Sequence, residues 1–147
     1  DEVIFGQRDV STVSNDITIS YTFNQKMGLN MNTRHYWSKV KYNGFSVLGE
    51  EGQLSASDYN EFHDLSFTAF TVDMDYRWRF APGSEIAVVW KNNISGVFQD
   101  QSTDYRQLGY SDGISRLKAL PQTNSLSVRF SYYLDYNDNL KGLFNKE

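Results

Sequence analysis

The chain contains no cysteine. A disulfide framework, a thiolate metal site and a cysteine nucleophile are therefore excluded, while the redox compartment stays open. Positive charge is also scarce, because 14 Lys and Arg stand against 18 Asp and Glu and give a formal net charge of -4. Such a chain has no basic surface for nucleic acid, and we expect no nucleic-acid partner.

Long apolar runs are missing as well. The longest, such as residues 86–90, fall far short of the roughly 18 residues that a membrane-spanning helix needs. The hydrophobic share of 39% and the mean hydropathy of -0.56 are typical of soluble proteins. Only half of each strand in a porin-like barrel meets lipid, however, so average composition does not separate the two classes. The periodicity of the sequence has to decide.

Residues 70–80 alternate strictly between large apolar and polar side chains. Because strand side chains have a period of two, this predicts a strand with one apolar and one ionised face. The segment has about the length that a tilted strand needs to cross a hydrocarbon core. The aromatic content of 16% also suits the aromatic girdles of a barrel.

Weaker copies of this pattern predict five strands in all, at about residues 13–23, 28–42, 66–80, 85–93 and 124–136. The connections between them alternate in length: residues 24–27 and 81–84 are short, whereas 43–64 and 95–123 are long. Outer-membrane barrels have such tight periplasmic turns and extended outer loops.

We therefore predict an all-β fold, an antiparallel transmembrane β-barrel segment in the cell outer membrane. Five strands cannot close, since bacterial single-chain barrels have an even number of at least eight. We expect residues 1–147 to be a single domain, the C-terminal portion of a larger barrel. The predicted lipid-facing residues are Phe70, Val72, Met74, Tyr76, Trp78, Phe80, Leu126, Val128, Phe130, Tyr132, Leu134 and Tyr136. The predicted lumen-facing residues are Arg34, Asp73, Asp75, Arg77, Arg79, Arg129 and Asp135.

Three stretches resemble a known family: residues 34–42 (RHYWSKVKY), 76–85 (YRWRFAPGSE) and 127–136 (SVRFSYYLDY). They are similar to the C-terminal barrel region, a domain of unknown function, of Gram-negative outer-membrane proteins that carry an N-terminal carbohydrate-binding family 9-like domain. The most specific element is the turn at residues 78–84. The resemblance implies a surface protein linked to carbohydrate binding or uptake through a module outside these residues, and it implies no catalytic residue.

Three groups of side chains are candidate sites. The lumen-facing charges either select solutes or neutralise one another across strands. Asp58, Glu61, His63 and Asp64 include Ca²⁺-type ligands, but their spacing matches no EF-hand, and we predict neither metal nor cofactor. His35 shares its parity with Leu29, Met31 and Trp37. It would be the base of a membrane hydrolase or an interfacial residue beside Trp37, and the lack of a Gly-x-Ser-x-Gly motif favours the second.

The sequence thus predicts an outer-membrane element with a structural or transport role and no catalysis of its own. The expected partners are outer-membrane lipid, the remaining strands of the parent barrel, the barrel-assembly machinery and, through the module outside these residues, carbohydrate. Two alternatives stay open. One is a surface hydrolase, a glycosidase or lipase, with its active site elsewhere; the other is a soluble antiparallel β-sandwich binder.

Overall fold

The computed structural model describes residues 2–99 and 109–134. They form an antiparallel sheet of six strands, which confirms the predicted all-β class. The strands are β1 (Ile4–Asn24), β2 (Met27–Leu48), β3 (Leu54–Ala56), β4 (Leu65–Ala81), β5 (Ser84–Phe98) and β6 (Gln122–Ser131). A short helix, α1 (Tyr110–Arg116), and a 3-10 turn, η2 (Leu117–Ala119), stand between β5 and β6.

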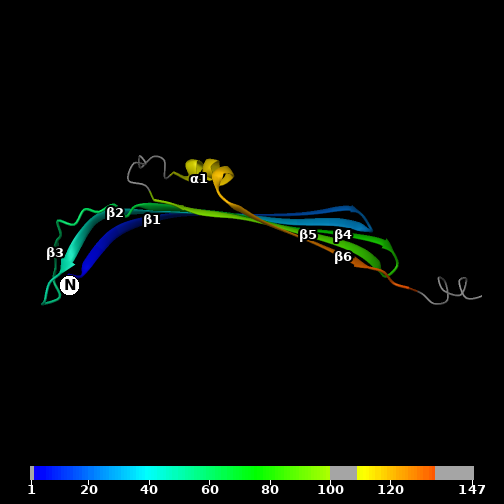
Figure 1. Cartoon of the computed structure of the whole chain (residues 1–147), viewed down its shortest axis with the longest axis horizontal. Coiled ribbons are helices and arrows are strands. Elements are labelled where there is room, and N and C mark those ends of the chain that lie inside the picture. Colours follow the sequence, from blue (N-terminus) through cyan, green and yellow to red (C-terminus); the bar gives the residue numbers. More distant parts are fainter. Residues whose placement is uncertain (1, 100–108, 135–147) are drawn as a thin grey trace, which may run out of the picture. The chain divides into compact units, whose positions relative to one another are not determined.

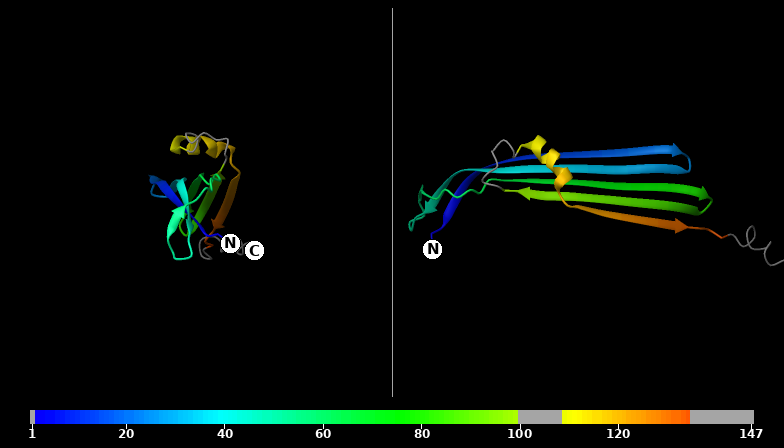
Figure 2. Two further views of the ribbon diagram at one scale, coloured as in Figure 1. Left: turned by 90° about the vertical axis from the view of Figure 1, so that its left-hand side faces the viewer. Right: turned by 45° about the horizontal axis from the view of Figure 1, so that its top comes forward.

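The long strands lie side by side in the order β1-β2-β4-β5-β6 (Figure 1). The short β3 folds back on the end of β2, where Ser46 is opposite Ala56 and Leu48 is opposite Leu54. Since β1 and β6 are the two ends of the order, the described sheet is not closed. The five long strands that follow one another in the chain are therefore neighbours, and the chain runs up and down through them (Figure 2).

Two tight turns connect the strands at one end. In the turn between β1 and β2, the side-chain oxygen of Asn24 accepts the backbone N–H of Lys26 at 2.8 Å, as asparagine commonly does in turns. The turn between β4 and β5 contains Pro82 and Gly83, and Gly83 has a φ of 70°. A residue with a Cβ would be strained there, so glycine fixes the position of this turn.

The strands are longer at their other ends than the sequence predicts. β1 begins at Ile4 rather than near residue 13, β2 runs to Leu48 rather than residue 42, and β5 runs to Phe98 rather than residue 93. Backbone hydrogen bonds continue there without a clean side-chain alternation, as in the bond from Leu48 N–H to Val3 O at 3.0 Å. β6, in contrast, ends at Ser131 instead of residue 136, and residues 135–136 lie outside the described ones.

The chain groups into two compact units, each built from parts of the same strands. As far as the structure describes them, unit 1 comprises residues 1–16, 34–71 and 93–123, and unit 2 comprises residues 17–33, 72–92 and 124–147. In unit 1 the most buried side chains include Trp37, Ile94 and Thr68, and in unit 2 they include Val72 and Ala87. Both units therefore have thin cores.

The described helices are short. Among the residues that the structure covers, none of the helices combines the length and the apolar content that crossing a membrane would take.

Candidate functional site on the two faces of unit 2

One face of the sheet in unit 2 is apolar across all its strands. Rings from different strands meet on it, since the ring centroids of Phe23 and Tyr76 lie 6.3 Å apart and those of Phe80 and Phe130 lie 5.6 Å apart. Large side chains on this face are exposed, from 40% for Trp78 to 67% for Leu126. We call this surface the apolar face; its exposed members are Ile17, Ile19, Tyr21, Phe23, Trp78, Leu126, Val128, Phe130 and Tyr132.

Aromatic rings concentrate on the apolar face close to the two tight turns. Trp78 and Phe80 lie next to the β4–β5 turn with ring centroids 5.9 Å apart, and Tyr21 and Phe23 lie next to the β1–β2 turn at 4.8 Å. Tyr132 stacks near Phe80 at 6.3 Å. These rings form a band at one end of the face, where a barrel would carry an aromatic girdle.

The predicted lipid-facing residues differ in their surroundings. Met74, Tyr76 and Phe80 are half-buried, and Val72 is buried. Phe70 belongs to unit 1, where its ring lies 6.4 Å from that of His35. Trp78, Leu126, Val128, Phe130, Tyr132 and Leu134 are exposed, and Tyr136 lies outside the described residues. Their contact with lipid stays a prediction.

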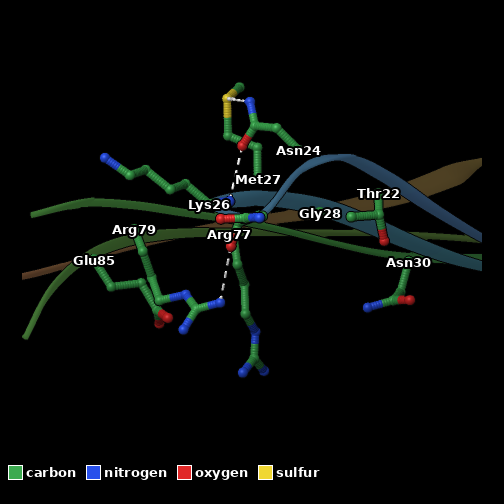
Figure 3. A pocket seen from close by; sticks show the side chains of 10 residues that line it. Thr22, Asn24, Lys26, Met27, Gly28, Asn30, Arg77, Arg79 and Glu85 are labelled. Carbon is green, nitrogen blue, oxygen red and sulfur yellow. Dashed lines mark hydrogen bonds between the residues drawn. The ribbon is translucent and has the colours of Figure 1, made fainter. Parts of the chain in front are cut away.

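The opposite face of unit 2, here the polar face, is hollowed at two places. A cavity of about 410 Å³ is lined by Thr18, Ser20, Asn30, Asn32, Asp73, Asp75 and Lys91, among others. A second cavity of about 450 Å³ lies toward the tight turns and is lined by Thr22, Asn24, Gln25, Lys26, Met27, Gly28, Asn30, Arg77, Arg79 and Glu85 (Figure 3).

Ion pairs neutralise most of the charge on the polar face. Asp75 pairs with Arg77 at 2.8 Å, and Asp73 pairs with Lys91 at 3.7 Å. Glu85 pairs with Arg129 at 3.3 Å. Each pair has at least one exposed partner, so it contributes no more than about 1 kcal/mol. Four of the predicted lumen residues therefore occur in balanced pairs, which favours neutralisation over a strong charge selectivity.

Arg79 has a structural partner that the sequence does not reveal. Its backbone N–H donates to Lys26 O at 2.8 Å, and its Nη2 donates to Gln25 O at 3.1 Å (Figure 3). Arg79 thereby holds the β1–β2 turn from a strand 54 positions away in the sequence. Of the remaining predicted lumen residues, Arg34 is exposed in unit 1, and Asp135 lies outside the described residues.

Unit 1 buries polar side chains beneath α1. His35 is 7% exposed; its Nε2 lies 3.2 Å from Thr68 Oγ1, and its ring centroid lies 5.4 Å from that of Tyr110 on α1. Asn15 donates to the Tyr110 hydroxyl at 2.8 Å. Burial lowers the pKa of His35, because desolvation disfavours the charged ring. His35 is thus packed under a helix, whereas the sequence predicts an interfacial residue; the helix lies in a segment predicted as loop.

A glycine lets α1 approach the sheet. A Cβ on Gly113 would lie 2.8 Å from Trp37 Cδ1, so only glycine fits above this indole ring. Trp37 also contacts Tyr110, with ring centroids 5.9 Å apart. The residues that the structure describes contain no group of three or more His, Asp or Glu that could hold a metal ion, so the Ca²⁺ hypothesis for Asp58, Glu61, His63 and Asp64 finds no support.

Comparison with known proteins places the chain in a family. A family model described as "Domain of unknown function (DUF5916)" matches residues 1–144. The chain belongs to the DUF5916 family. No curated protein and no solved structure matches it. The match confirms the resemblance to a domain of unknown function, while the partner module and the Gram-negative context stay predictions.

The family description assigns no chemistry to the DUF5916 domain. Its function therefore has to be argued from the two faces of unit 2 and from the surroundings of unit 1.

Proposed function

We propose that this DUF5916 domain is a wall segment of a β-barrel in the cell outer membrane, with a structural or transport role and no catalysis of its own. In this arrangement the apolar face of unit 2 meets lipid, and the polar face lines an aqueous lumen. The further partners are the remaining strands of the parent barrel and the barrel-assembly machinery. The link to carbohydrate rests on the sequence resemblance and not on the contacts described above.

One observation carries the proposal: the strand positions that form the apolar face of unit 2 carry no Asp, Glu, Lys, Arg or His, although many are exposed. The charged strand residues of unit 2 all have the opposite parity, namely Asp73, Asp75, Arg77, Arg79, Glu85, Lys91 and Arg129. An exposed apolar patch of this extent is rare on a soluble protein and indicates that a partner covers it. The hydrocarbon layer of a membrane is a suitable partner, because it forms no hydrogen bonds with the face that it covers.

The length of the apolar face agrees with this partner. Residues 72–80 of β4 extend over about 27 Å at about 3.4 Å per residue. At a tilt of about 40° they cover roughly 20 Å along the membrane normal, close to the band of about 25 Å on known barrels. The aromatic band at the turns would then lie at one membrane interface.

The chain contains no cysteine, so a thiol introduced into it is the only one within residues 1–147, and any cysteine elsewhere in the full-length protein is first replaced by serine. We choose Met74, Tyr76 and Trp78 on the apolar face, and Asp73, Asp75 and Arg77 as matched controls on the polar face. In the full-length protein in lipid bilayers, lipid-dissolved oxygen should reach the first three labels, and a water-soluble nickel complex should reach the controls.

The same labels separate the alternatives. A soluble β-sandwich would shield positions 74, 76 and 78 from oxygen beneath a second sheet. Equal oxygen accessibility at all six positions would also refute the proposal.

A further inference from the structure

Unit 1 contains a cavity that the proposed function does not use. It has a volume of about 330 Å³ and lies between the end of β2 and the segment that leads into β4. We call it the aromatic pocket. Its lining residues are Tyr42, Asn43, Gly44, Phe45, Tyr59, Asn60, Glu61, Phe62, His63 and Asp64.

Four rings of the lining are in mutual contact. Phe45 is stacked with Tyr42 at a centroid distance of 5.5 Å and meets Tyr59 edge to face at 4.9 Å. His63 lies 5.6 Å from both Tyr59 and Phe45 and 5.7 Å from Tyr42. The aromatic wall is therefore assembled from β2 and from the segment before β4, and these side chains are half-buried.

Several donors of the pocket are already hydrogen-bonded within the protein. The Tyr59 hydroxyl donates to Glu61 Oε2 at 3.0 Å, so His63 Nε2–H donates to the Tyr59 oxygen at 2.7 Å. Asp64 Oδ1 accepts the backbone N–H of Tyr42 at 2.7 Å, and Asn43 donates to Asp9 Oδ2 at 2.7 Å. The Tyr59 and His63 donors are thus occupied, and a ligand would meet the carboxylates of Glu61 and Asp64 beside the amides of Asn43 and Asn60.

The charge balance points the same way. The lining contains the carboxylates Glu61 and Asp64, and its residues include no Lys or Arg. Partial desolvation, the hydrogen bond to Glu61 and the Glu61 charge raise the pKa of the Tyr59 phenol, which therefore keeps its proton. Aromatic faces attract cations through their quadrupole, and neighbouring carboxylates add to this attraction.

We propose that the aromatic pocket binds a small organic cation with a quaternary ammonium head. The cavity volume is at the lower end of the range for small-molecule sites, which suits a ligand of about the size of choline. Positive charge is what distinguishes this ligand from a neutral sugar, whose hydroxyls the carboxylates and amides of the lining would also bind. The inference rests on unit 1 alone and does not depend on whether unit 2 meets lipid.

The test uses the full chain in an uncharged polyoxyethylene detergent and two ligands of the same shape. Choline carries the charge, and 3,3-dimethyl-1-butanol is its neutral counterpart. Isothermal titration calorimetry should show choline binding about tenfold or more tighter than the alcohol, as expected for a cation–π contact that is at least partly desolvated. Absence of choline binding at millimolar concentration, or equal binding of the two ligands, would overturn the proposal.

Two matched variants locate the site. Glu61→Gln keeps the shape of a lining residue and removes its charge, and it should weaken choline binding about three-fold or more. Glu51→Gln removes an equivalent charge outside the lining and should leave the affinity unchanged. Equal effects of the two variants would contradict the proposed site, and so would tighter binding of glucose than of choline. Matching circular dichroism spectra for both variants would show that the fold is intact.

Discussion

Units 1 and 2 share the same strands but differ in what covers their sheet. Unit 1 buries Lys39, Ser66, His35 and Thr68, the last with no exposed surface, and its α1 covers part of the sheet. Unit 2 leaves Leu126, Val128 and Phe130 more than 60% exposed. Side chains alternate between the two faces of the sheet in both units. The alternation therefore defines two faces, but it does not determine whether protein, lipid or water contacts each face. In unit 1 a helix of the chain covers the sheet; in unit 2 we propose that lipid covers it.

The strongest challenge to this contrast is a charge on the apolar face. Met74→Arg in the full-length protein should lower the free energy of unfolding in bilayers by about 2 to 4 kcal/mol, because the guanidinium would enter hydrocarbon near the middle of the strand. The folded fraction is measured in liposomes across a urea series.

Asp75→Asn is the matched control on the polar face. Asp75 lies beside Arg77 on this face, and water can solvate the new amide. The free energy of unfolding should therefore change by no more than about 1 kcal/mol. A larger loss for Asp75→Asn than for Met74→Arg would mean that the two faces are assigned the wrong way round.

The helix cover of unit 1 depends on Gly113. Gly113→Ala should lower the free energy of unfolding by about 1 to 3 kcal/mol. The added Cβ would lie 2.8 Å from Trp37 Cδ1 and would force α1 away from the sheet. Hydrogen exchange of the α1 amides should become faster. Gly44→Ala is the control, because a Cβ at Gly44 meets nothing within 4 Å. Equal effects of the two changes would contradict the described packing.

Burial of His35 predicts that the stability of unit 1 depends on pH in a way that the stability of unit 2 does not. The pKa of His35 is lowered in the folded state, so the unfolded chain binds more protons at low pH. The stabilisation is complete above the unfolded pKa of about 6.5 and is lost as the pH falls below it, by at most about 1.4 kcal/mol per pH unit for one proton. Hydrogen exchange of unit 1 amides between pH 7.5 and 5 measures this loss.

His35→Gln supplies the comparison, since it removes this titration and keeps the other of the 2 histidines. The variant should show a flatter pH profile in unit 1. An unchanged slope would assign the pH dependence to another group.

The smallest effect is expected at the ion pairs of the polar face. Glu85→Gln breaks the pair with Arg129, whose side chain is 68% exposed, and should change the free energy of unfolding by less than about 1 kcal/mol. A chemical denaturation series at low salt measures it, and a loss comparable to that of Met74→Arg would show that this face is drier than proposed.

The sequence predicts the five long strands and both tight turns, because alternation and the Pro82-Gly83 pair are local signals. It does not predict α1. That helix has seven residues with a glycine inside and no side-chain N-cap hydrogen bond, so its own propensity is weak. Distant contacts hold it instead, including Trp37 beneath Gly113 and the Arg116 guanidinium 5.0 Å from the Phe98 ring.

The candidate sites were predictable only in part. The charged residues of β4 are evident from parity. The ion pairs of Asp73 with Lys91 on β5 and of Glu85 on β5 with Arg129 on β6 depend on how the strands align, which the sequence does not state. The aromatic pocket was visible only as an acidic segment around Glu61. Its rings come from Tyr42 and Phe45 as well, and a fold-back of the chain brings these together with Tyr59.

The two bonds from Arg79 to the β1–β2 turn have a consequence for how the sheet assembles. If β4 slipped by one residue during folding, Trp78 or Phe80 would stand opposite that turn. Phenylalanine has no donor for Gln25 O, and the indole has a single N–H on a rigid ring in place of the five N–H donors of a guanidinium on a long side chain. The same slip would exchange the charged and the apolar side chains of the whole strand. Arg79 therefore adds a penalty to a misaligned intermediate at the turn itself, and it favours correct alignment of β4 while the rest of the strand is still pairing.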